Sequence, residues 1–121
     1  MRIQKLCPTA QVPLHGSQYS AGYDLFAAIP EAVVIPAHTT LLIGTGWAME
    51  IPEGKFGAIF ARSGLAVKEG LRPANCIGVI DSDYRGEVKV ALHNDTDLNR
   101  VVTPGERIAQ LIILDFTSID F

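Results

Sequence analysis

The chain has 121 residues, of which 48% are hydrophobic and 19% charged, and its formal net charge is −3. This composition predicts one folded domain over residues 1–121 and excludes a disordered chain. No block of Lys or Arg occurs, so we expect no nucleic-acid partner. The N-terminus lacks the apolar core of a signal peptide and no apolar run could cross a bilayer, so we expect a cytoplasmic protein with no membrane partner.

The residue pattern in the first half of the chain predicts short β-strands. Prolines and glycines separate runs that are rich in β-branched and aromatic residues or that alternate in hydrophobicity. Pro52-Glu53-Gly54 predicts a hairpin turn between two of these runs. The two cysteines, Cys7 and Cys76, fit no zinc spacing and are expected to be free, buried thiols, with one disulfide as the alternative. The predicted strands cover residues 32–35, 39–44, 47–51 and 55–60.

One short helix is predicted over residues 63–69. Ser63 can cap its start and Gly70 can end it. This segment has the features of an anion-binding site. The first N–H groups of a helix are unpaired, Arg62 adds a planar positive charge, and the small Gly64 lets an anion approach the backbone. The alternative interpretation is an ordinary capped helix that follows a surface arginine.

Residues 78–94 predict a β-hairpin, with an apolar strand over residues 78–80 and an alternating strand over residues 87–94. Asp81 lies at the end of the first strand. A carboxylate held at the mouth of a rigid turn is well placed to hold and polarise a water molecule. The alternative is a solvated, turn-forming acid.

A last strand is predicted over residues 107–116. Gln110 lies there in an apolar run, so its amide must find either a backbone partner or a ligand. His15, His38 and His93 have no metal-ligand spacing and are interpreted as structural or surface residues. Many short strands with Gly/Pro turns predict an all-β protein, closed or built of two sheets.

Four segments of this chain together resemble, in order, four of the five motifs of the homotrimeric dUTP pyrophosphatases (dUTPases), of bacterial or phage type. The resemblance implies a distorted jelly roll with one short helix, and a homotrimer with its sites at subunit interfaces. The fifth motif, a glycine-rich C-terminal tail, has no counterpart in residues 111–121, so we expect the native polypeptide to continue past Phe121. The four segments are AGYDLFAA at 21–28, ARSGLA at 61–66, GVIDSDYRG at 78–86 and GERIAQL at 105–111.

The resemblance also implies an activity: hydrolysis of dUTP to dUMP and pyrophosphate, with Mg²⁺ bound across the phosphates. Asp81 would activate the water that attacks the α-phosphorus, and Tyr84 would pack against the deoxyribose. Asp24 would reach a water bound to the magnesium ion. The phosphates would be held by Arg62, Ser63, Gly64 and Gln110, and the uracil by Asn75 and by backbone at Gly78, Val79, Ile80 and Lys89.

Two other functions remain open from the sequence. A dUTPase-fold protein that binds or regulates without catalysis would explain the missing fifth motif, although it has no need of the residues at the proposed site. A dCTP deaminase shares the fold, but it carries a catalytic Glu on the strand after the acidic turn, where this chain has Ala91.

Overall fold

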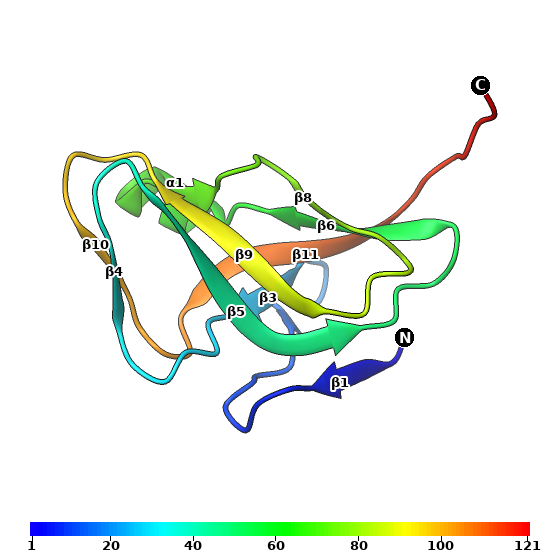
Figure 1. The fold of residues 1–121 in the computed structure, drawn as a ribbon, viewed down its shortest axis with the longest axis horizontal. Helices are drawn as coiled ribbons and strands as arrows, with labels where there is room; N and C mark the ends of the chain where they lie inside the picture. The colour runs from blue at the N-terminus through cyan, green and yellow to red at the C-terminus, as the bar shows by residue number, and fades with distance from the viewer.

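The computed structural model describes all 121 residues and has two main antiparallel sheets, one packed across the other (Figure 1). The four-stranded sheet has the order β1 (Ile3–Lys5), β5 (Thr40–Met49), β9 (Glu87–Asn94), β7 (Leu71–Pro73). The five-stranded sheet has the order β2 (Leu14–His15), β3 (Tyr23–Phe26), β11 (Arg107–Asp115), β6 (Lys55–Phe60), β8 (Gly78–Ile80). A small third sheet pairs β4 (Val33–Ile35) with β10 (Arg100–Val102). The predicted all-β class with one short helix is confirmed.

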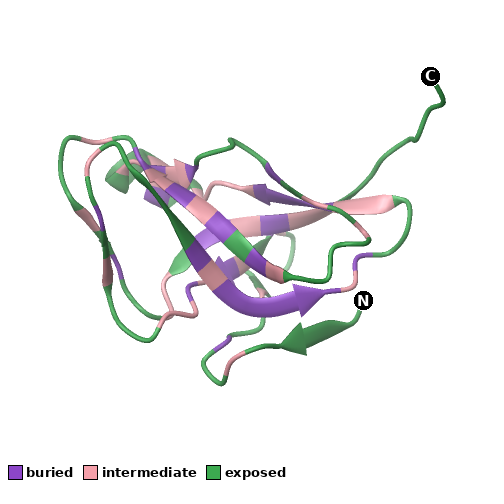
Figure 2. Ribbon diagram, in the orientation of Figure 1, coloured by how far each residue is buried: buried purple, intermediate pink, exposed green.

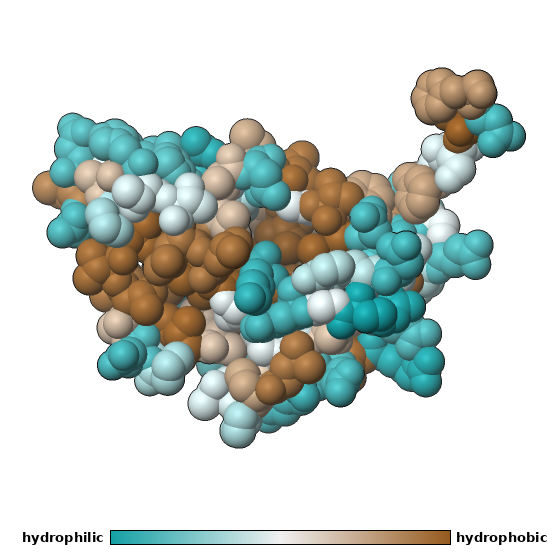
Figure 3. Space-filling model, viewed as in Figure 1, coloured by the Kyte–Doolittle hydropathy of each residue, from teal (hydrophilic) through white to brown (hydrophobic).

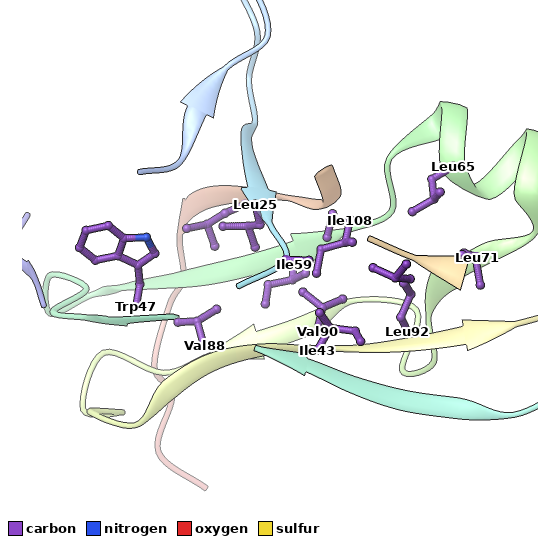
Figure 4. Close-up of a cluster of buried hydrophobic side chains, with 14 of the residues drawn as sticks. Leu25, Ile43, Trp47, Ile59, Leu65, Leu71, Val88, Val90, Leu92 and Ile108 are labelled. Carbon is purple, nitrogen blue, oxygen red and sulfur yellow. The ribbon is translucent and has the colours of Figure 1, made fainter. Parts of the chain in front are cut away.

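The hydrophobic core lies between the two main sheets. Val88, Val90 and Leu92 are all at most 1% exposed, because alternate side chains of β9 point to the same face. Figure 4 shows them facing Leu25 and Ile59 of the other sheet. Buried and exposed positions alternate along β9 in Figure 2 as well, which confirms the pattern predicted for this strand.

The predicted hairpin over residues 78–94 is wrong. β8 pairs with β6, whereas β9 pairs with β5 and β7, so residues 81–86 pass from one sheet to the other. The predicted hairpin around Pro52 is wrong for the same reason, because β5 and β6 also belong to different sheets. An apolar strand, a turn and a second strand have the same pattern whether the strands pair or face each other across a core.

Helix α1 (Ser63–Glu69) has the predicted span, but a different residue caps its start. The N-cap is Arg62 in an extended conformation, with no side-chain capping bond, and Ser63 is already helical. Gly70 ends the helix as predicted, with φ 66° and its N–H directed to the carbonyls of Leu65 and Ala66. No helix in the protein has both the length and the hydrophobicity to span a bilayer.

Both cysteines are free, as predicted. The expectation that they are buried is wrong, since Cys7 is only half-buried and Cys76 is exposed. Cys76 lies in the loop before β8 with φ 64°, a conformation that holds its side chain at the surface beside Asn75.

Candidate functional site: two half-sites at the ends of β6

Asp81 lies at the mouth of a cavity of about 290 Å³ between the two sheets. The cavity exists because β8 and β9 diverge into different sheets, which leaves a gap where a hairpin would have closed. Glu87 also contributes a carboxylate, but its Oε2 accepts a hydrogen bond from the N–H of Gly46 at 3.0 Å. Asp81 is exposed and has no such partner within the protein. The lining residues are Leu42, Val79, Ile80, Asp81, Tyr84, Glu87 and Lys89.

The ring of Tyr84 is held in one orientation above the loop that carries Asp81. Its hydroxyl donates to the carbonyl of Glu87 at 2.9 Å. The ring also covers Gly86, where an added Cβ would lie 2.5 Å from Oη and 2.7 Å from Cζ of Tyr84. Only glycine therefore fits at position 86, and the outer side of the ring, with the residue 43% exposed, remains open to a ligand.

Asn75 and Gly78 do not line the Asp81 cavity, unlike the other residues predicted to contact the base. Asn75 is exposed in the preceding loop, where its carbonyl accepts a hydrogen bond from the N–H of Ile77 at 2.7 Å. Gly78 is buried opposite Ile59. The amide nitrogen of Asn75 is nevertheless 3.7 Å from the position of a Cβ at Gly78, so Asn75 lies beside the start of β8.

A second group of polar side chains lies where β3, β11 and β6 run side by side. Asp24 is held between two arginines, with Oδ1 at 3.3 Å from Nε of Arg62 and Oδ2 at 3.2 Å from Nη1 of Arg107. Arg62 also donates to the carbonyl of Arg107 at 3.3 Å. The Asp24 side chain is 14% exposed, so both arginines are oriented by a carboxylate that is largely removed from water.

Gln110 lies opposite Asp24 in the pairing of β11 with β3 and opposite Phe60 in the pairing with β6. Its amide donates to the carbonyl of Ala61 at 3.0 Å, directly before Arg62. The amide oxygen of Gln110, Oε1, occupies the space beside Gly22, where it would overlap an added Cβ. The backbone partner expected for a glutamine in an apolar strand is therefore present.

The surface beside these residues is a cavity of about 460 Å³ with three cationic side chains on its wall. Arg62 and Gly64 were predicted for this region, whereas Ser63 is not among the lining residues. Sequence reasoning missed Arg107 and Lys68. Arg107 lies in the motif at 105–111, three residues before Gln110, and Lys68 lies in the last turn of α1, but no local pattern shows that the two face one surface. The charged lining residues are Arg62, Lys68, Arg107, Glu69 and Glu106.

The two cavities lie at opposite ends of β6. Gly57 pairs with Ile80, which immediately precedes Asp81, and β6 ends at Phe60 just before Arg62. An extended strand rises about 3.3 Å per residue, so the five steps from Gly57 to Arg62 cover about 16 Å. Asp81 and Arg62 of one chain are therefore too far apart to contact the same compact triphosphate.

The residues near Arg62 can support a magnesium ion only together with a phosphate ligand. No three His, Cys, Asp or Glu side chains come together as a metal cage. Both oxygens of Asp24 are already paired with arginines. Mg²⁺ in proteins usually keeps several waters and is held by one or two carboxylates and by substrate phosphates. Because both Asp24 oxygens are paired with arginines, an ion at this surface would depend mainly on substrate phosphates and waters for its ligands.

Known proteins of one family are similar to this chain in both sequence and structure. The sequence model described as dUTPase matches residues 9–121. The deoxyuridine 5′-triphosphate nucleotidohydrolase of Paramecium bursaria Chlorella virus 1 is 44% identical over 111 residues, covering 92% of this chain and 76% of the viral protein.

Two solved structures are similar over 99% of this chain. A mutant dUTPase of Staphylococcus bacteriophage 80alpha with dUpNHpp has a TM-score of 0.89 and 27% identity, over 85% of that chain. A mutant dUTPase from phage phi11 of S. aureus, whose structure concerns the coordination of a structural Mg(II) ion, has a TM-score of 0.86 and 25% identity, over 93% of that chain.

Proposed function

This chain belongs to the dUTPase family, and from that premise we propose how it hydrolyses dUTP to dUMP and pyrophosphate. The observation that carries the proposal is the exposed carboxylate of Asp81 at a cavity of about 290 Å³, with Tyr84 fixed beside it. The Asp81 carboxylate orients a water molecule and takes its proton. The water oxygen then bonds to the α-phosphorus, the bond from the α-phosphorus to the bridging oxygen breaks, and pyrophosphate leaves.

The base is recognised by backbone groups on the edge of β8. β8 is the last strand of its sheet, so one of its sides has N–H and C=O groups without strand partners. Lys89 of β9 lies across the cavity and pairs on one side only, with Gly44. Hydrogen-bond donors and acceptors at these positions match those of uracil. Cytosine would leave some of these groups unpaired, which costs binding free energy when the groups are buried. Asn75, which lies beside the start of β8, contributes its side-chain amide to recognition of the base.

The sugar and the phosphates are bound by different groups. Tyr84 packs flat against the deoxyribose and leaves no space for a 2′-hydroxyl. The phosphates are held by Arg62, the amides of Ser63 and Gly64, and Gln110, and we add Arg107 and Lys68 because they line the same cavity. A magnesium ion, when bound with the phosphates, would offset part of their negative charge. Asp24 keeps the two arginines oriented. Its carboxylate would also be the group that meets a water of a bound magnesium ion.

The active unit is a homotrimer, in which one subunit supplies the Asp81 cavity and another supplies the Arg62 cavity. Two observations support this assembly. Gly57, which pairs with the residue before Asp81, lies about 16 Å from Arg62, as estimated from the strand rise. Apolar surface also extends over β4, β10 and β5 in Figure 3, where Val34, Val101 and Leu42 are more than half exposed.

Pyrophosphate release from dUTP, dCTP, dTTP and UTP tests the proposal. We expect dUTP to be preferred by roughly 10⁴-fold, as is typical of sites that recognise a substrate through hydrogen bonds. Comparable rates with UTP would contradict the role of Tyr84, and ammonia release from dCTP would contradict the reaction type.

A further inference from the structure

The loop that carries Asp81 has little support from the sheets. Residues 81–86 connect β8 and β9, which lie in different sheets, so no strand ladder runs along this segment. Within it, one backbone hydrogen bond forms, from the N–H of Tyr84 to the carbonyl of Asp81 at 3.1 Å. The position of a catalytic carboxylate on such a loop depends on side chains that bond to its backbone.

Arg85 supplies two of these bonds from a single nitrogen. Its Nη1 donates to the carbonyl of Ser82 at 2.6 Å and to the carbonyl of Tyr84 at 3.1 Å. The guanidinium thus joins the beginning of the loop to its middle. Bonds from a charged donor to a carbonyl are stronger than neutral ones, so this contact restrains the loop more than a turn bond does.

Arg85 also lines a cleft of about 680 Å³, together with Ser82 and Asp83 of the same loop. Glu50 lines this cleft and accepts a hydrogen bond from Arg2 at 2.7 Å. The pKa of Glu50 lies below its ordinary value, first because of Arg2 and to a smaller degree because of Arg85. Arg85 therefore bonds to the loop carbonyls and lines the same cleft as Glu50, while it is absent from the lining of the Asp81 cavity.

We propose that Arg85 is a positioning residue that holds the Asp81 loop in its catalytic geometry without touching the substrate. It acts through the carbonyls of Ser82 and Tyr84, while the Tyr84 hydroxyl secures the end of the loop to Glu87. The inference rests on the proposed role of Asp81. Displacing a catalytic group by about 1 Å can cost on the order of 10²-fold in rate, so a loosened loop lowers kcat more than it weakens binding.

The test compares Arg85→Ala and Arg85→Lys with Lys5→Ala, a control that removes the same charge from an exposed residue of β1. In Arg85→Ala we expect kcat for dUTP to fall by roughly 10- to 100-fold with little change in KM. Added guanidinium at a sub-denaturing concentration should restore part of the rate, whereas sodium chloride of equal ionic strength should not. Arg85→Lys should keep an intermediate kcat, and Lys5→Ala should match the parent.

Hydrogen exchange of the nucleotide-free protein gives a second readout, independent of activity. Amides of residues 82–87 should exchange faster in Arg85→Ala than in the parent, with exchange in β9 and β11 unchanged. A kcat equal to that of the parent together with unchanged loop exchange would overturn the proposal. Faster exchange throughout the protein would also overturn it, since Arg85 would then stabilise the fold in general. Faster loop exchange in a protein that never hydrolyses dUTP would support the restraint by Arg85 and contradict only the role of Asp81.

Discussion

Two carboxylates line one cavity, and their surroundings give them different roles. Glu87 is half-buried and its Oε2 bonds to the N–H of Gly46, which has φ 77° where β5 bends. Asp81 is exposed at the cavity mouth and is free to bind water. Glu87 therefore serves the fold, while Asp81 is available as the base. The sequence predicts Asp81 as the base and nothing about Glu87, because the partner of Glu87 depends on a contact between residues distant in sequence.

Asp81→Asn tests this assignment directly. The amide keeps the size of the side chain but does not accept a proton from water, so turnover of dUTP should fall by about 10²–10⁴-fold. Binding of a non-hydrolysable analogue, measured by calorimetry, should stay close to that of the parent. Turnover near the parental rate, with cleavage still at the α-phosphorus, would show that another group acts as the base.

Gly22→Ala tests the position of Gln110. Gly22 is buried, and the added methyl group would overlap the Gln110 amide, which then loses its bond to Ala61. We expect a loss of about 1–3 kcal/mol in the free energy of unfolding, as for other overpacked sites, and a higher KM for dUTP. Urea unfolding and steady-state kinetics measure the two effects.

The matched control is Gly16→Ala, where the nearest neighbour of the new methyl group is Ser20 Oγ at an ordinary 3.6 Å. If Gly22→Ala behaved like this control in both measurements, Gln110 would have no part in holding the phosphates.

Among the elements, the helix and the longer strands were predicted, although β5 is one strand where two were expected. The pairing of the strands was not predicted, nor were the short strands β1, β2, β3, β7 and β10. The alternation of apolar and polar residues predicted β9, and Gly70, which adopts a left-handed conformation, predicted the end of α1. The same local pattern misassigned residues 78–94 as a hairpin, because alternation specifies which face is buried and not which strand is the neighbour. Arg107 and Lys68 were missed because their role depends on β11 and α1 meeting at one surface.

One ion pair joins β7 to the segment after β9, and we expect it to make the stability of the folded protein depend on pH. Arg72 donates to Asp95 at 2.6 and 3.1 Å. The pKa of Asp95 is lowered from 3.8, mainly by this hydrogen bonding. A lowered folded-state pKa means that the pair stabilises the protein above the unfolded-state pKa, and that this contribution is lost as pH falls below 3.8 through the folded-state pKa.

Thermal unfolding of the parent and of Asp95→Asn at several pH values checks this. The parent should have the higher Tm at neutral pH, and the difference should shrink as the pH falls below 3.8, the ordinary value for Asp95. Asp120→Asn, which changes an exposed carboxylate near the end of the chain, serves as the control and should show no such trend. A Tm difference that is constant with pH would contradict the role of the ion pair.

At the scale of the whole molecule, the separation of the two half-sites is the feature with the largest consequence. The sheet register sets Asp81 and Arg62 towards opposite ends of β6, so one chain carries both proposed half-sites without joining them. No sequence pattern gives this separation, because it follows from which strands pair with β6. The family resemblance implied shared sites, and the register supplies a physical reason for them.

The most direct measurement mixes two inactive variants, Asp81→Asn and Arg62→Ala, under conditions that allow subunits to exchange. In a trimer whose sites combine residues of two subunits, random mixing at equal amounts gives about a quarter of the sites both native residues. We therefore predict that pyrophosphate release from dUTP rises in the mixture well above that of either variant alone. Activity that stays at the level of the separate variants after exchange, or parental activity in a monomer, would contradict a site shared between copies of this chain.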